Sequence, residues 1–184
     1  MYDVTKTFNK IIARYSNIKE YPGKIITVFH GRKYWNPGMV IKSPAIEYLL
    51  ARGNGEEVAF GYAEGLLERL TDFSNLTILE EAAYQAQQTG YCNPFVSTTL
   101  MRDVARSFTV HDGKPGFLLT IQGPEGYFYD FNGFREHYGI PRPSTFGWLQ
   151  EFGIPFQILP PFELARVDKI VNIREDGECL FSKG

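Results

Sequence analysis

"PFVSTTLMRDVARSF", residues 94–108, runs from a strand-like segment directly into a helix-like one. Apolar and polar residues usually alternate along a strand with one buried face, because successive side chains point to opposite faces. Ser97, Thr98 and Thr99 break that alternation, so at least one hydroxyl is expected to point inward, where it needs a partner. A threonine that caps the helix explains one hydroxyl but not three. We therefore predict a strand over 95–99, a helix over 100–108 and a polar site where they meet.

The composition limits the class of protein. The 184 residues are 43% hydrophobic and 22% charged, which fits one globular domain over 1–184. The net charge of −2 gives no sign of a nucleic-acid-binding surface. No apolar run is long enough to span a membrane, and the N-terminus lacks the apolar region of a signal peptide. Cys92 and Cys179 provide neither a disulfide framework nor a metal motif, and we expect a cytoplasmic protein or one secreted without a signal peptide.

The order of the expected elements indicates an α+β fold, with helices first and strands mostly later. Ser43 and Pro44 are typical of a helix start, and Gly53 of a helix end. Residues 116–123 and 126–132 are expected to form a strand pair, and 135–148 an irregular loop. Apolar periodicity predicts helices over 5–18, 43–53, 56–73, 74–90 and 100–108, and strands over 23–31, 95–99, 116–123, 126–132, 150–161 and 162–175.

Two further polar residues depart from their surroundings. His30 ends the apolar segment "TVFHGR", and Gly31 after it allows a backbone or a ligand to approach closely. The simpler explanation is a core histidine beside a turn glycine. Glu151 stands among Trp148, Phe152 and other apolar residues, where a carboxylate costs free energy unless it is paired. Its simpler explanation is an outward position on an edge strand.

The ordered set of "FHG", "STTLMRDVARSF" and "EFGIPFQILPPFELARV" resembles the mono-ADP-ribosyltransferase superfamily. The closing segment is most similar to the cholera and pertussis toxin group, although His30 stands where that group usually has an arginine. Arg32 is then the candidate for the missing cation. The arginine-specific members carry a second glutamate, where this chain has Leu149. Gln157 is an alternative occupant of the catalytic glutamate position, and would make the protein catalytically degenerate.

The resemblance implies two small, roughly perpendicular antiparallel sheets around a cleft that binds NAD+, flanked by helices. It implies cleavage of the nicotinamide–ribose bond, with Glu151 stabilising the positive charge that develops on the ribose. Ser97 would hold the carboxylate or the ribose, and His30 would bind a ribose hydroxyl. The resemblance requires no metal. The residues it suggests for binding NAD+ are His30, Gly31, Arg32, Ser97, Thr98 and Tyr62, with Lys33, Tyr34 and Phe60 as further candidates.

The same resemblance implies that the ADP-ribose acceptor is a protein side chain, and that the chain is a bacterial or phage effector or toxin, related to virulence and delivered into a host cell. The expected loop over 135–148 would recognise the acceptor. Its candidate contacts are Phe146, Trp148, Arg135, Arg142 and Tyr138. Two other classes stay open: a cysteine hydrolase using Cys92 with His111 or His137, and a binding module that keeps the transferase fold without activity.

Overall fold

The computed structural model describes residues 2–15, 23–88, 90–109, 113–139 and 151–171. Within these ranges the chain forms six α-helices and six strands, so the expected α+β class is confirmed. No helix in this part is long and apolar enough to cross a membrane. The helices are α1 (Val4–Tyr15), α2 (Pro44–Ala51), α3 (Glu56–Leu70), α4 (Leu76–Gln88), α5 (Arg102–Ser107) and α6 (Phe131–Tyr138). The strands are β1 (Ile25–Arg32), β2 (Phe95–Thr99), β3 (Gly116–Pro124), β4 (Tyr129–Asp130), β5 (Glu151–Pro155) and β6 (Glu163–Ile170).

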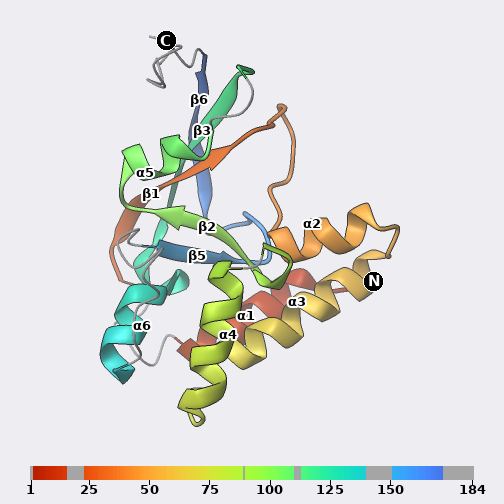
Figure 1. Ribbon diagram of the computed structural model, residues 1–184, viewed down its shortest axis with the longest axis vertical. Coiled ribbons are helices and arrows are strands. Elements are labelled where there is room, and N and C mark those ends of the chain that lie inside the picture. The colour runs from red at the N-terminus through yellow and green to blue at the C-terminus, as the bar shows by residue number, and fades with distance from the viewer. Residues whose placement is uncertain (1, 16–22, 89, 110–112, 140–150, 172–184) are drawn as a thin grey trace.

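The strands form one open antiparallel sheet in the order β4-β5-β2-β1-β3-β6 (Figure 1). We expected two sheets, and the structure corrects this. The sheet is nevertheless almost divided in the middle, because β1 and β2 share a single pair of residues, Phe29 and Thr99. By contrast, β1 is paired with β3 from Ile25 to Arg32. Two well-paired halves, β4-β5-β2 and β1-β3-β6, therefore meet at a narrow junction.

The two faces of the β1-β3-β6 half are covered differently. Leu119 and Ile121 of β3 belong to the large core cluster that also contains Phe8 of α1 and Phe60 of α3. Leu118 points the other way and packs on Ala105 of α5 in a small separate cluster. Helices α1 to α4 accordingly gather as one group in Figure 1, and α5 lies apart from them beside β1.

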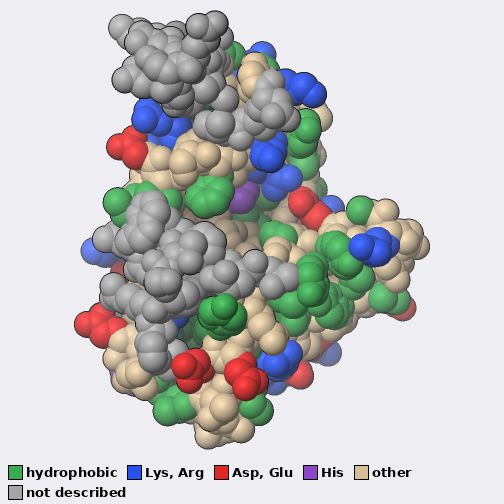
Figure 2. Space-filling view, in the orientation of Figure 1, with side chains coloured by type: hydrophobic (Ala, Val, Ile, Leu, Met, Phe, Trp, Pro, Cys, Tyr) green, Lys and Arg blue, Asp and Glu red, His purple; other side chains and the backbone are tan. Residues whose placement is uncertain are grey.

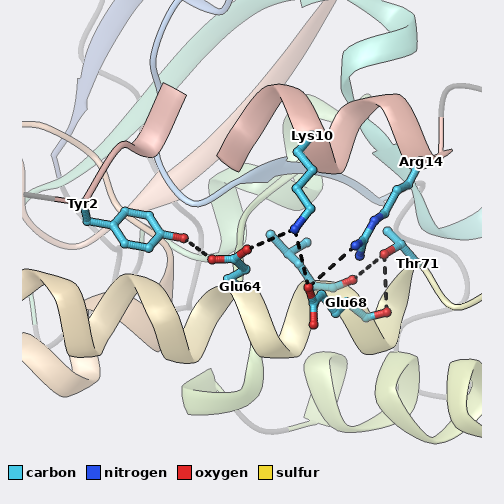
Figure 3. A network of polar contacts seen from close by, with 7 residues as sticks. Tyr2, Lys10, Arg14, Glu64, Glu68 and Thr71 are labelled. Carbon is cyan, nitrogen blue, oxygen red and sulfur yellow. Dashed lines mark hydrogen bonds and ion pairs between the residues drawn. The ribbon is translucent and has the colours of Figure 1, made fainter. Parts of the chain in front are cut away.

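Helix α1 is held to α3 by apolar burial and by a row of polar contacts. The apolar periodicity that predicted this helix forms a buried stripe of Phe8, Ile11, Ile12 and Tyr15. Along the edge of this contact, Lys10 lies 3.7 Å from Glu64 and 3.9 Å from Glu68, and Arg14 lies 3.6 Å from Glu68 (Figure 3). Such exposed pairs add little free energy each, so burial of the stripe accounts for most of the attachment.

Local sequence signals explain several helix ends. The Ser43 side chain accepts from the Ile46 N–H and Pro44 is the first residue of α2, as expected. Helix α6 was not expected, because the aromatic run before it favoured a strand. Its signals are nevertheless present: the Asp130 side chain accepts from the Gly133 N–H at the start, and Gly139, with φ of 66°, ends it.

The expected strand pair between residues 116–123 and 126–132 is wrong. The first segment, in β3, pairs with β1 and β6. The second is mostly a 3-10 turn (Glu125–Tyr127), the two-residue strand β4 and the start of α6. Strand β4 pairs with β5 at the far edge of the sheet. The turn after Pro124 therefore sends the chain across the sheet instead of back along β3.

Candidate functional site

A cavity of about 240 Å³ lies at the narrow junction between the two halves of the sheet. The space-filling view shows the molecule hollowed in the middle of the face drawn in Figure 2. The cavity brings together His30 of β1, Ser97 of β2 and Glu151 of β5, three residues far apart in the sequence. Gly31 and Thr98 line it too. The other lining residues are Phe29, Ala86, Asn93, Thr99, Val104, Ala105 and Phe108.

The His30 side chain bridges the junction. Its Nδ1 is hydrogen-bonded to the carbonyl oxygen of Ser97, which lies across the gap on β2. A carbonyl oxygen can only accept, so Nδ1 carries the proton in this contact. This side-chain bond joins β1 and β2 close to the place where their backbone pairing stops.

The environment of His30 keeps its ring neutral. Burial disfavours the charged imidazolium and lowers the pKa of His30 from 6.5 to about 4. The nearby charge of Arg32 adds to this lowering, and the hydrogen bond to Ser97 opposes it. With the proton fixed on Nδ1, Nε2 presents a lone pair. This atom is buried and has no hydrogen-bond partner among the described residues.

The three consecutive hydroxyls have three different partners. Ser97 Oγ accepts from the side-chain amide of Asn93 at 2.8 Å. Thr98 is buried, and its hydroxyl donates to the carbonyl oxygen of Phe152 at 2.7 Å. Thr99 Oγ1 accepts from the Met101 N–H at 3.1 Å and so supports the turn into α5. All three residues line the cavity, and the run also supplies a structural bond to β5 and the turn into α5.

Asn93 is a site residue that the sequence did not reveal. It is buried and lines the cavity, and besides its bond to Ser97 it accepts from the Phe95 N–H through its side-chain oxygen. Its two side-chain bonds fix the amide, so Asn93 holds the Ser97 hydroxyl in one place. The only signal was an asparagine before a proline at the start of a strand, which usually indicates a turn.

Glu151 begins β5 and lies opposite Thr99 of β2. Directly paired residues of antiparallel strands share a face, so Glu151 is on the same face as Thr99 and Ser97. The residue is 8% exposed and lines the cavity. Gln157, the alternative to Glu151, is not among the cavity residues; it forms an isolated bridge with Lys42 beyond the end of β5.

The backbone of α5 approaches β1 so closely at Gly31 that a side chain would not fit there. A Cβ atom at this position would lie 1.9 Å from the carbonyl oxygen of Ala105 and 3.1 Å from Cβ of Phe108. Helix α5, which follows β2, therefore packs directly on β1 across the junction. Of the two partners suggested by the sequence, a backbone or a ligand, the structure supplies the backbone.

Five residues suggested for binding NAD+ do not line the cavity: Arg32 and Tyr62, and the further candidates Lys33, Tyr34 and Phe60. Arg32 forms an ion pair with Glu47 of α2 at 3.1 Å, and its Nε donates to the Tyr34 carbonyl. Tyr62 lies on α3 beside Cys92, and burial together with the hydrogen bond to Cys92 raises its pKa. Arg32 points to the same side of β1 as His30, one step further along the strand, because it is two residues away.

The contacts of Cys92 and His137 give no support to the cysteine hydrolase alternative. In the described residues Cys92 contacts a tyrosine, Tyr62, and His137 packs on its neighbour Tyr138 in α6. His111 lies outside the described residues. No described contact therefore joins Cys92 to a histidine, as that chemistry would need.

The expected recognition loop is described only in its first part. Residues 135–138 belong to α6, not to a loop, and this corrects the expectation. Arg135 is buried, with its guanidinium 5.9 Å from the ring centre of Phe131, and Tyr138 stacks on Phe73 at 5.3 Å. Arg135 is therefore not an exposed contact. Arg142, Phe146 and Trp148 lie outside the described residues.

Comparisons with known protein families, with curated proteins and with solved structures find no match to this chain.

Proposed function

We propose that this protein is a mono-ADP-ribosyltransferase that cleaves NAD+ at the bond between nicotinamide and ribose. The observation that carries the proposal is the convergence of His30, Ser97 and Glu151, from three different strands, on one cavity at the junction of the sheet. A buried carboxylate, a hydroxyl held by Asn93 and an unpartnered ring nitrogen are the groups that recognition of a ribose needs.

The lone pair of His30 Nε2 is suited to a hydroxyl donor. A buried acceptor without a partner costs roughly 1–3 kcal/mol, and a ribose O–H that reached it would remove that cost. The atom has no exposed surface, so a hydroxyl reaches it only after a small shift of the neighbouring side chains. Because the pKa of His30 is about 4, the ring stays an acceptor at neutral pH.

The proposed reaction breaks the bond between C1′ of the ribose and the ring nitrogen of nicotinamide. The bonding electron pair leaves with nicotinamide and neutralises its positive ring, while positive charge develops on the ribose. The Glu151 carboxylate stabilises that charge, and Ser97 positions the carboxylate or the ribose. An acceptor side chain, or water in simple hydrolysis, then bonds to C1′ and loses a proton.

The size of the cavity is consistent with binding one end of the dinucleotide. Its volume of about 240 Å³ is below the roughly 300–1,000 Å³ typical of pockets that enclose a drug-sized ligand. The nicotinamide and its ribose would enter the cavity, and the remaining part of NAD+ would extend over the surface. The acceptor that we propose, a protein side chain, and the effector role both rest on the resemblance of the sequence motifs.

Release of nicotinamide from NAD+ by the purified chain tests the proposal. We expect Glu151→Gln to lower the rate about 10²–10³-fold, because it removes a charge that acts on the transition state. Binding of NAD+, measured by calorimetry, should change much less. Glu163→Gln is the matched control, since Glu163 is an exposed glutamate on β6 that does not line the cavity.

Three other outcomes contradict the proposal in different ways. Full activity of Glu151→Gln would remove Glu151 from the mechanism. NAD+ binding without nicotinamide release by the wild type would indicate the inactive binding module. If the wild type neither binds NAD+ nor releases nicotinamide from it, NAD+ is not the ligand of the cavity.

A further inference from the structure

A second recess, separate from the cavity, lies where the end of β1, the start of β3 and the end of β6 meet. Its volume is about 320 Å³, and it shares no lining residue with the cavity. Six of its lining residues matter for its chemistry: Lys33, Tyr34, Trp35, Lys114, Phe117 and Lys169. The recess therefore combines lysines with aromatic rings.

The described walls of the recess are positively charged. Three lysines line it, and none of its described lining residues is acidic. Neither Lys33 nor Lys114 has an ion pair in the described part of the chain. The nearest acidic residue along β6, Asp168, points to the opposite face and pairs with Arg166 and Arg102. In Figure 2 basic side chains gather in the upper half of the molecule, and acidic ones are commoner below.

The aromatic residues add two features beyond the positive charge: an exposed ring and a buried N–H group. The Tyr34 side chain is 65% exposed at the recess. Trp35 packs on Phe117 with ring centres 6.0 Å apart, and its indole Nε1–H is buried with no acceptor among the described residues. An exposed ring offers a stacking surface, and an unpartnered N–H is suited to an oxygen acceptor.

We propose that this recess binds a nucleotide, with its phosphate on Lys33 and Lys114 and its base against the ring of Tyr34. Lysine binds phosphate as a point charge, and exposed aromatic side chains stack on bases of any sequence. An oxygen of the ligand would satisfy the Trp35 N–H after a small movement of the ring edge. An acidic peptide would use the lysines but would bring no planar group for Tyr34, so a nucleotide fits better.

A free nucleotide and a nucleotide within a single strand present the same chemistry, and two probes distinguish them. One is a fluorescent oligothymidylate of about ten nucleotides, followed by anisotropy, and the other is AMP, followed by calorimetry. The variants are Lys33→Ala combined with Lys114→Ala, and Tyr34→Ala. The matched control is Lys10→Ala, because Lys10 lies on α1 beside Glu64 and Glu68.

The double lysine variant should weaken binding at least about tenfold at low salt and reduce the salt dependence by about 0.7 per phosphate lost. Tyr34→Ala should weaken binding roughly tenfold with little change in salt dependence, and Lys10→Ala should leave binding unchanged. Loss of AMP binding in the variants assigns a free nucleotide, and loss of oligonucleotide binding alone assigns a single strand. The proposal fails if neither probe binds, if Lys10→Ala weakens binding equally, or if an oligoglutamate peptide competes as well as the oligonucleotide.

Discussion

Protonation of His30 should make the fold sensitive to mild acid. The pKa of His30 is lowered from 6.5 to about 4 in the folded state, chiefly by burial. A group with a lowered folded pKa binds protons more weakly in the folded state than in the unfolded one. Its contribution is therefore fully present above pH 6.5 and is lost as the pH falls from 6.5 towards 4.

The size of this effect follows from the two pKa values. Each pKa unit corresponds to about 1.4 kcal/mol, so the full loss near pH 4 is about 3 kcal/mol. Between pH 7 and pH 5 the linkage relation gives a loss of about 2 kcal/mol.

Urea unfolding of the wild type and of His30→Asn, followed by circular dichroism from pH 7 to pH 4.5, measures this contribution. Asparagine keeps an N–H donor for the Ser97 carbonyl but does not titrate. Between pH 7 and pH 5, the free energy of unfolding of the wild type should fall by about 2 kcal/mol more than that of His30→Asn. Parallel pH curves for the two proteins would refute the reasoning. His137→Asn, a change at an exposed histidine of α6, controls for the removal of a histidine elsewhere.

Two glycine substitutions should have opposite effects on the free energy of unfolding, measured by urea titration. Gly31→Ala should cost about 3 kcal/mol, because its Cβ would meet the Ala105 carbonyl oxygen at 1.9 Å; a loss below 1 kcal/mol would contradict the close packing of α5 on β1. Gly61→Ala, with open space around it in α3, should gain about 0.5–1 kcal/mol. Thr98→Val should cost about 1–2 kcal/mol by leaving the Phe152 carbonyl without its hydroxyl donor, and an unchanged urea midpoint would contradict this.

Residues of the cavity could be predicted from the sequence where a residue conflicted in character with its immediate neighbours. His30 ended an apolar strand, Ser97 belonged to an uninterrupted run of hydroxyls, and Glu151 stood in an apolar segment. Such conflicts are visible locally, and the structure places all three at one cavity.

Asn93 and the division of the sheet could not be predicted from local patterns. Asn93 is a cavity residue only because β2 lies beside β1, which brings Ser97 and His30 together. The number of pairs between two strands depends on how the whole sheet twists and on where α5 crosses it. Helix α6 is a different case, because Asp130 and Gly139 signalled its two ends while the aromatic run that leads into it favoured a strand over 126–132.

The strand order has a consequence for how fast the protein folds. Among the described strands, no two neighbours in the sheet are joined by a tight hairpin: helices separate β1 from β2 and β4 from β5 along the chain. The most extensive pairing, between β1 and β3, joins residues such as Arg32 and Phe117 from distant parts of the sequence. The chain must close long loops before this pairing forms, whereas α2, α3 and α4 form from local contacts. Folding dominated by such distant pairings takes roughly milliseconds to seconds, so the sheet should complete well after the helices.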